Sequence, residues 1–185
     1  MPEPSPPFVR LATLDDAEAI RAIYNREVVG STVTFDLVPR TLDDQRAWLA
    51  AHAGAHPAVV AVAGAAVVGF GSLSPYRDRP AYATTVEDSV YVHPEARGRG
   101  VGRALLAELV RLAEVHGFHA VMARIVGGHE TSIALHEACG FVLVGVEQEV
   151  GRKFGRWLDV VLMQRLLAED AAPRRPVLDP PVPST

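Results

Sequence analysis

A glycine- and arginine-rich segment directly before an amphipathic helix constrains this chain more than any other feature. Residues 97–103 read RGRGVGR, and three glycines within seven residues cost conformational entropy on folding. The strand-like SVYV, residues 89–92, precedes the segment, and a helix is predicted over residues 102–116. The apolar positions of this helix keep helical spacing and predict a core stripe at Val101, Leu105, Leu109 and Leu112.

A turn from a strand into a helix can hold a phosphate or a pyrophosphate. The first N–H groups of a helix lack partners within the helix, and the helix dipole places about half a positive charge there. Arg97, Arg99 and Arg103 would add charge-assisted hydrogen bonds. The sequence therefore predicts an anion site at Gly98, Gly100, Val101 and Gly102.

Several motifs compete for this segment. A Walker loop needs a lysine that is absent here, and a dinucleotide fingerprint needs G-x-G-x-x-G where this chain has G-x-G-x-G. The following strand also offers no acidic residue for a ribose. Two interpretations stay open at this point: the R-x-x-G-x-G pyrophosphate loop of acyl-coenzyme A enzymes, and a glycine-rich connector with solvated arginines.

Composition places the chain among ordinary globular proteins. It has 185 residues, of which 49% are hydrophobic and 22% charged, so one packed domain is expected. A net charge of −4 gives no attraction to nucleic acid or to an anionic membrane. The single cysteine, Cys139, excludes an internal disulfide and argues against a metal site. No apolar run suits a membrane span, and the first residues do not resemble a signal peptide, so a cytoplasmic protein is expected.

The order of predicted elements indicates the fold class. Proline-rich composition predicts disorder in residues 1–7 and 168–185. Between them, Thr13 and Thr41 are predicted to cap helices over residues 14–28 and 42–52. Further helices are expected over residues 102–116 and 130–140. Strands are predicted over residues 8–13, 58–64, 66–74, 83–92, 119–126, 141–150 and 156–166, with residues 75–82 as a loop. Hairpins at both ends around a central strand–helix–strand unit favour an α/β fold with a mixed, mostly antiparallel sheet.

Four sequence blocks carry a more specific resemblance. They are IYNREVVGSTVTFDLVPRT, PYRDRPAYATTVEDSVYVHPEARGRGVG, SIALHEACGF and GRKFGRWLDVVLMQ. Together they resemble the GNAT acetyltransferases, in particular the phosphinothricin N-acetyltransferase branch, over residues 8–167. The resemblance implies a GNAT fold in a single domain, acetyl-CoA as cosubstrate and a homodimer. It also implies acetyl transfer to the amino group of phosphinothricin, methionine sulfoximine or methionine sulfone.

The resemblance implies Glu87 as the general base. An ammonium ion must lose a proton before it attacks a thioester, and a carboxylate whose pKa is raised by burial can accept it. Glu87 could equally face solvent or pair with an arginine, and Asp88 is its neighbouring rival. Strand alternation places the two on opposite faces, although the fold leads us to expect a β-bulge that would disturb this alternation.

The resemblance also implies His136 as a proton donor to the departing coenzyme A thiolate. Many GNAT enzymes have tyrosine at this position, four residues before Gly140, and this branch has histidine. An imidazole titrates near neutral pH, so it can act as an acid there. The alternative is a helix histidine whose ring is simply satisfied by a backbone partner.

Binding residues follow from the same resemblance. Backbone groups of Val90, Tyr91 and Val92 are expected to hold the pantetheine arm, and residues 98–103 the pyrophosphate. Ser132 and His129 are expected near the cofactor, although His129 replaces the asparagine usual in the family. The candidate substrate residues are Thr34, Phe35, Arg77, Arg79 and Tyr82. Lys153 and Trp157 are expected either to close the pocket or to contact a second subunit.

Two other functions remain possible from the sequence. One is acetylation of a different amine or of a protein N-terminus, which would need a wide groove. The other is a non-catalytic acyl-CoA-binding module, which would keep the glycine loop and have no need of Glu87 or His136. No metal is needed for the chemistry, since the thioester supplies the reactive bond.

Overall fold

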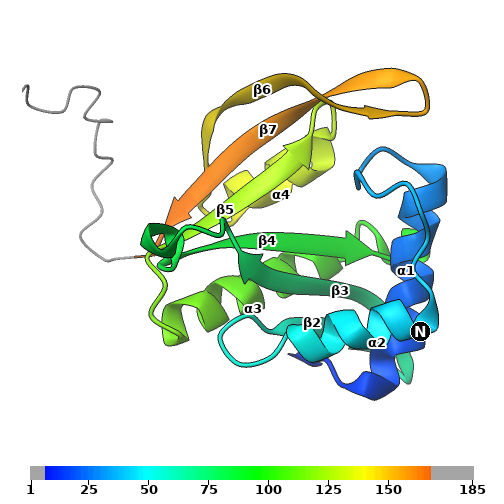
Figure 1. The fold of residues 1–185 in the computed structure, drawn as a ribbon. Coiled ribbons are helices and arrows are strands. Elements are labelled where there is room, and N and C mark those ends of the chain that lie inside the picture. Colours follow the sequence, from blue (N-terminus) through cyan, green and yellow to red (C-terminus); the bar gives the residue numbers. More distant parts are fainter. Residues whose placement is uncertain (1–6, 168–185) are drawn as a thin grey trace, which may run out of the picture.

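Seven strands form one mixed sheet in the computed structural model, which describes residues 7–167 (Figure 1). The strand order is β1-β2-β3-β4-β5-β7-β6, and only β4 and β5 pair in parallel. The strands are β1 (Phe8–Leu11), β2 (Ala58–Ala63), β3 (Ala66–Pro75), β4 (Thr85–Val92), β5 (Ala120–Val126), β6 (Val142–Lys153) and β7 (Arg156–Leu166). The predicted fold class, a mixed and mostly antiparallel α/β sheet, is confirmed.

Four α-helices cover the two faces of this sheet. They are α1 (Ala17–Gly30), α2 (Leu42–Ala51), α3 (Val101–Val115) and α4 (Glu130–Ala138). Side chains of α1 and α2 pack with Ala58, Val60 and Phe70 on one face. The helix α3 packs on the opposite face, where Val59 and Ala61 lie because side chains alternate along a strand. Each face therefore has its own apolar cluster.

Capping residues set the starts of the first two helical segments. The carboxylate of Asp16 accepts hydrogen bonds from both the backbone and the hydroxyl of Thr13, and Asp44 does the same for Thr41. These capping boxes satisfy N–H groups that a helix start would otherwise leave unpaired. The predicted first helix begins with a short 3-10 turn, Leu14–Asp16, before α1, and it runs two residues beyond residue 28.

The helix α3 lies close to β3 because β3 carries glycine beneath it. A Cβ at Gly69 or Gly71 would meet leucine side chains of α3 and backbone oxygens of β4 at about 3 Å. The predicted stripe is confirmed, with Val101, Leu105 and Leu109 almost fully buried. This close packing fixes the N-terminus of α3 against the end of β4.

The remaining differences from the sequence prediction are small, with one exception. The loop after β3 contains a 3-10 turn at Pro80–Tyr82, and other boundaries shift by one to three residues. The exception is the β-bulge expected in β4, a prediction that is wrong for its pairing with β3. The β3–β4 register runs without a shift from Gly69 opposite Val92 to Pro75 opposite Val86. Strict alternation therefore holds at Glu87 and Asp88.

The predicted disordered ends lie outside the described residues, apart from Pro7. Within residues 7–167, no helix has both the length and the apolar character that a bilayer span requires.

Candidate active site

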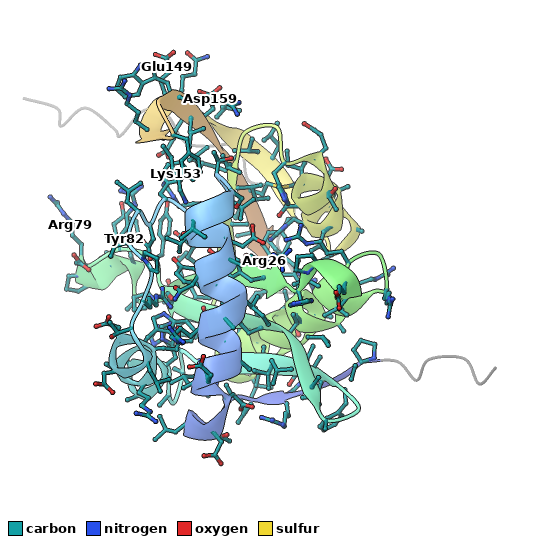
Figure 2. All side chains as sticks on the ribbon, turned by 90° about the vertical axis from the view of Figure 1, so that its right-hand side faces the viewer. Arg26, Arg79, Tyr82, Glu149, Lys153 and Asp159 are labelled. Carbon is teal, nitrogen blue, oxygen red and sulfur yellow. The ribbon has the colours of Figure 1, made fainter. Side chains whose placement is uncertain are left out.

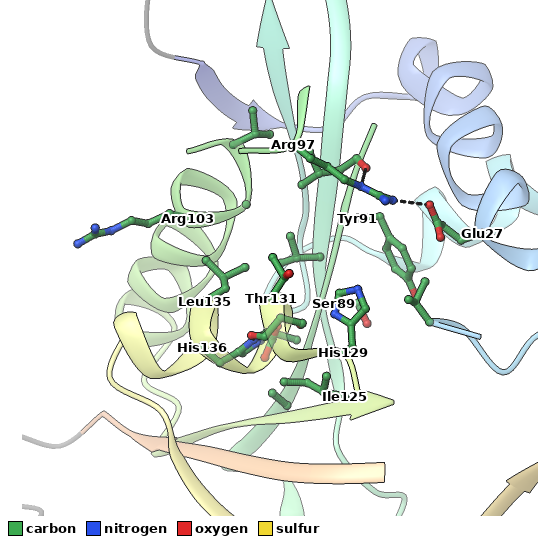
Figure 3. A pocket seen from close by; sticks show the side chains of 18 of the residues that line it. Glu27, Ser89, Tyr91, Arg97, Arg103, Ile125, His129, Thr131, Leu135 and His136 are labelled. Carbon is green, nitrogen blue, oxygen red and sulfur yellow. Dashed lines mark hydrogen bonds and ion pairs between the residues drawn. The ribbon is translucent and has the colours of Figure 1, made fainter. Parts of the chain in front are cut away.

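A cleft opens where β4 and β5 separate. The two strands pair only at residues 85–87 of β4 and 120–122 of β5. Beyond that point β4 stays paired with β3 and β5 with β7, so the facing edges diverge. The cleft has a volume of about 360 Å³ and is lined by residues 88–92, residues 123–126, the glycine loop and the first two turns of α4 (Figure 3). The edge of β4 that contains Val90, Tyr91 and Val92 is therefore free to bind an extended ligand.

The glycine loop lies at one end of the cleft. Gly98 and Gly100 have φ values of 74° and 78°, in the left-handed region that favours glycine. Gly100 is the N-cap of α3, and no side chain caps this helix start. The first N–H groups of α3 are thus available to an anion. Gly100, Val101, Gly102 and Arg103 all line the cleft.

The three arginines of the loop do not share one role. The guanidinium of Arg97 lies 2.7 Å from the carboxylate of Glu27 on α1 and also donates to the backbone oxygen of Val92 (Figure 3). Arg99 and Arg103 are exposed, and Arg103 extends outward from α3. Arg97 therefore links the glycine loop to α1, because its guanidinium is paired with Glu27.

Glu87 and Asp88 point to opposite faces of β4. Asp88 lies on the face of Val86, Val90 and Val92, which pack toward α3, while Glu87 shares its face with Tyr91 and so with α1. Burial raises the pKa of Glu87 to about 7, against a smaller lowering by the charge of Arg124. A carboxyl group with that pKa is half ionised at neutral pH, as a general base should be.

Asp88 is buried against His136. The Nε2 atom of His136 lies 3.1 Å from Oδ2 of Asp88, and Nδ1 lies 2.7 Å from the backbone oxygen of Ser132. Burial lowers the pKa of His136, but the hydrogen bond and charge of Asp88 outweigh it, so the pKa lies above the usual value. Its place beside Glu87 in the sequence makes Asp88 an alternative candidate base, but in the structure Asp88 hydrogen-bonds to His136, the expected proton donor.

The first turns of α4 complete the cleft wall. His129 is the N-cap residue of α4, and its side chain and that of Ser132 line the cleft. Burial, followed by the positive charge of Arg97, lowers the pKa of His129, so its imidazole is neutral at pH 7. A neutral imidazole offers one donor and one acceptor, which suits an amide-containing ligand.

The predicted substrate residues fall into two groups. Thr34 and Phe35 lie on the α1–α2 connection, where the Nζ atom of Lys153 donates to the backbone oxygen of Thr34 at 2.8 Å. The Phe35 ring occupies the space above Gly151 in β6. Lys153 is almost fully buried, so it ties the β6–β7 hairpin to this connection.

Arg77, Arg79 and Tyr82 form a separate, open depression on the β3–β4 loop. The guanidinium of Arg77 lies over the rings of Tyr76 and Tyr82, while Arg79 projects away from the body of the protein (Figure 2). None of these three predicted residues lines the β4–β5 cleft. The charge of Arg77 does act on Glu87, which connects the depression to the base electrostatically.

Two charged residues that line the cleft, Arg124 and Glu27, are not among the site residues predicted from the sequence. Arg124 lines the cleft from β5, and its guanidinium lies 2.8 Å from the carboxylate of Glu147 on β6. Glu27 of α1 also lines the cleft and is buried. Both carried a readable signal. Arg124 interrupts the otherwise apolar strand AVMARIV, and Glu27 falls on the apolar face of α1 at helical spacing from Ile20 and Ile23.

Among residues 7–167 no group of three histidine, cysteine or acidic side chains is arranged to hold a metal ion.

Comparison with known proteins gives a consistent result. The family model described as "Acetyltransferase (GNAT) family" matches residues 17–141. The chain is 44% identical to a phosphinothricin N-acetyltransferase of Alcaligenes faecalis over 161 residues, which cover 86% of this chain and 82% of that protein. It is 39% identical to an L-methionine sulfoximine/L-methionine sulfone acetyltransferase of Pseudomonas paraeruginosa, covering 84% of this chain and 92% of the relative.

Solved structures agree. A GNAT superfamily phosphinothricin acetyltransferase from Sinorhizobium meliloti, crystallised with acetyl-CoA, superposes with a TM-score of 0.85 at 41% identity. The match covers 88% of this chain and 89% of that one.

Proposed function

The chain belongs to the GNAT acetyltransferase family and is an N-acetyltransferase, and from this premise we propose that it transfers the acetyl group of acetyl-CoA to the α-amino group of a small amino acid. The acceptors that its relatives indicate are phosphinothricin, methionine sulfoximine and methionine sulfone. The observation that carries the proposal is the cleft between β4 and β5, which runs from the glycine-capped start of α3 to Asp88. The half-buried carboxyl group of Glu87, whose pKa is raised to about 7, is the next residue along β4 and lies on the opposite face of the sheet.

The residues of the cleft suit acetyl-CoA. The left-handed Gly98 and Gly100 present the start of α3 to a pyrophosphate, and the unpaired edge of β4 suits the amide groups of a pantetheine arm. We assign the backbone of Val90, Tyr91 and Val92 to that arm. We assign Arg99 and Arg103 to add charge at the open end, and His129 and Ser132 to contact the arm from α4. Arg103, His129 and Ser132 line the cleft, which supports their assignment. Bound acetyl-CoA supplies the activated thioester.

Glu87 is assigned as the general base. It lies on the face of the sheet that also carries the α1–α2 connection and the β6–β7 hairpin, so an amino acid held there presents its ammonium group to this carboxylate. Removal of one proton leaves a neutral amine, which can attack the thioester directly in a ternary complex. A positioned base of this kind contributes about 10²–10⁴ in rate. His136, on the other side of β4, is assigned as the proton donor to the departing thiolate.

The acceptor site is assigned to Thr34 and Phe35, with Arg77, Arg79 and Tyr82 at its outer rim. Arg77 and Arg79 lie on a surface loop, from which they can attract an anionic amino acid toward Glu87. Arginine can also grip a carboxylate or phosphinate with two hydrogen bonds.

Release of coenzyme A thiol, followed during incubation with each of the three acceptors, tests the proposed function. Mass spectrometry of the product should show one added acetyl group on the α-amino nitrogen. Saturable release with any of the three supports the proposal. Acetyl-CoA binding without release for all three would instead direct the search to other amines, including protein N-termini.

We also propose a homodimer that forms through β6. This strand lies at the end of the sheet order, and its exposed side chains are largely apolar: Val142, Leu143, Val144, Val146 and Val150. An exposed apolar edge strand is a surface prone to association. Light scattering should give twice the chain mass of 19.9 kDa, and a mass of one chain would refute the dimer.

We propose that the enzyme works in the cytoplasm, where a free thiol such as that of Cys139 stays reduced. Activity found in the soluble lysate of washed cells, and not in the culture medium, would support this location. Activity in the medium would contradict it.

A further inference from the structure

A buried carboxylate–imidazole pair forms part of the cleft wall and joins β4 to α4. The side chains of Asp88 and His136 are almost completely removed from solvent, with exposed fractions of 1% and 5%. Both residues line the cleft. The ring of Phe141 packs edge-on against the imidazole, with ring centres 5.0 Å apart, and so holds the ring plane in place.

The hydrogen bonds of the imidazole determine where its protons lie. The Nδ1 atom lies 2.7 Å from the backbone oxygen of Ser132, which can only accept, so Nδ1 carries a proton. The Nε2 atom lies 3.1 Å from Oδ2 of Asp88, which requires a second proton between these two atoms. An isolated imidazole holds that proton more tightly than an isolated carboxylate, with pKa values of about 6.5 and about 3.9. The proton therefore belongs to His136.

Among residues 7–167, His136 is the one side chain that hydrogen-bonds to the carboxylate of Asp88. Its second oxygen, Oδ1, is buried and has no hydrogen-bond partner among residues 7–167. Burial of a lone carboxylate is strongly unfavourable unless a partner carries the opposite charge. The imidazolium form of His136 supplies that charge.

The other titratable groups around the pair act less directly. On α4, the charge of His136 lowers the pKa of His129, and Cys139 lies one turn beyond the pair. Glu87 on the far face of β4 senses the charge of Asp88. Among the described residues, the charged groups of α3, β5 and β7 that face this region are Arg103, Arg124 and Arg165, and none of them hydrogen-bonds to Asp88 or His136.

We propose that Asp88 is a positioning residue that keeps His136 doubly protonated at neutral pH and so makes it a competent proton donor to the leaving thiolate. The inference rests on the proposed function, in which His136 supplies that proton. The raised pKa of His136 agrees with it. An arrangement with a neutral residue at position 88 would leave the imidazole neutral in this buried site.

The proton transfer balances. The C–S bond of the thioester breaks with its electron pair on sulfur, and sulfur takes the proton held between Nε2 and Oδ2. The amine nitrogen releases two protons on going from ammonium to amide. One of them replaces, through solvent, the proton that His136 has given up, and the other leaves through Glu87 to solvent.

Nuclear magnetic resonance of the imidazole nitrogens tests the inference without any turnover. In the wild-type protein, His136 should show both nitrogens protonated at pH 7, with the resonances assigned by their loss in His136→Asn. In Asp88→Asn its pKa should fall by about 1–3 units, the usual effect of removing a close opposite charge. The matched control is Asp43→Asn, which removes one exposed carboxylate from α2 and should leave His136 unchanged.

Kinetics give the second test. The fall of kcat at high pH should move to lower pH in Asp88→Asn, and this shift should disappear when His136→Asn is already present. A His136 that is neutral at pH 7 in the wild-type protein, or whose pKa is the same in Asp88→Asn, would overturn the inference. If Asp88→Asn does not fold, the wild-type measurement alone decides. Failure of the proposed function would look different, since all acceptors would be inactive while the imidazole remained doubly protonated.

Discussion

The two halves of the active site are built in different ways. The proposed cofactor half is mainly one stretch of sequence, which runs from Asp88 through the end of β4 and the glycine loop into α3. Residues 123–126 of β5, the start of α4 and Glu27 of α1 complete it. The proposed acceptor half is assembled from the α1–α2 connection, the β3–β4 loop and the β6–β7 hairpin, which are far apart in sequence. Glu87 lies between the halves, next to Asp88 in sequence and on the opposite face of β4.

This difference determines what holds each half in place. The cofactor half depends on local backbone geometry, because two left-handed glycines and the start of α3 form its anion site. The acceptor half depends on tertiary contacts, such as the hydrogen bond from Lys153 to Thr34 and the packing of Phe35 over Gly151. Substitutions should therefore affect the two halves separately.

The largest effect is expected at the boundary between the halves. Glu87→Gln keeps the shape of the side chain and removes the base, so kcat should fall by about 10²–10⁴ at pH 7. Calorimetry should show unchanged acetyl-CoA affinity, because the cofactor half is intact. Glu18→Gln, on the exposed surface of α1, is the control and should retain full activity. Equal activity of the two variants would remove Glu87 from its role.

The second effect isolates the cofactor half. A side chain at Gly98 must adopt φ near 74°, which costs about 1–2 kcal/mol for an L-residue. Gly98→Ala should therefore weaken acetyl-CoA binding roughly tenfold, if the loop relaxes out of its binding geometry. Gly64→Ala places the same strain in the β2–β3 turn, where a Cβ likewise meets nothing within 4 Å.

The two glycine variants should lose similar thermal stability, and only Gly98→Ala should lose acetyl-CoA affinity. Titration calorimetry and thermal unfolding measure the two quantities. The same acetyl-CoA affinity in both variants would show that the loop backbone does not bind the cofactor.

The smallest effect isolates the acceptor half. A methyl group at Gly151 overlaps the ring of Phe35, whereas a methyl group at Gly145 in the same strand meets nothing within 4 Å. Overpacking of about 1 kcal/mol in Gly151→Ala should raise the KM of the acceptor roughly fivefold. The affinity for acetyl-CoA should stay the same, and Gly145→Ala should behave as the wild type. A changed acetyl-CoA affinity in Gly151→Ala would break the separation of the two halves.

The sequence predicted the cofactor half better than the acceptor half for the same physical reason. The glycine loop, the stripe of α3 and the helix caps at Thr13 and Thr41 depend on neighbours a few residues away, and all of them appear in the structure. The pairing of Arg97 with Glu27 spans 70 residues and could not be read from the motif, which suggested a free guanidinium.

The face of each carboxyl group also depended on a tertiary feature. Alternation along β4 places Glu87 and Asp88 on opposite sides, and only the continuous β3–β4 register shows that no bulge reverses this. The contact between Asp88 and His136 joins positions 48 residues apart. The depression that holds Arg77, Arg79 and Tyr82 likewise follows from the path of a loop, which sequence periodicity does not describe.

The pH dependence of kcat/KM for the acceptor, measured in the wild type and in Glu87→Gln, tests the central claim most directly. Burial raises the pKa of Glu87 to about 7, and the base must be ionised to accept a proton. The rate of the wild type should therefore rise with pH through an apparent pKa near 7 and be lost as pH falls below it. This limb should be absent from the residual activity of Glu87→Gln. The same limb in both proteins would contradict the account and assign the titration to another group.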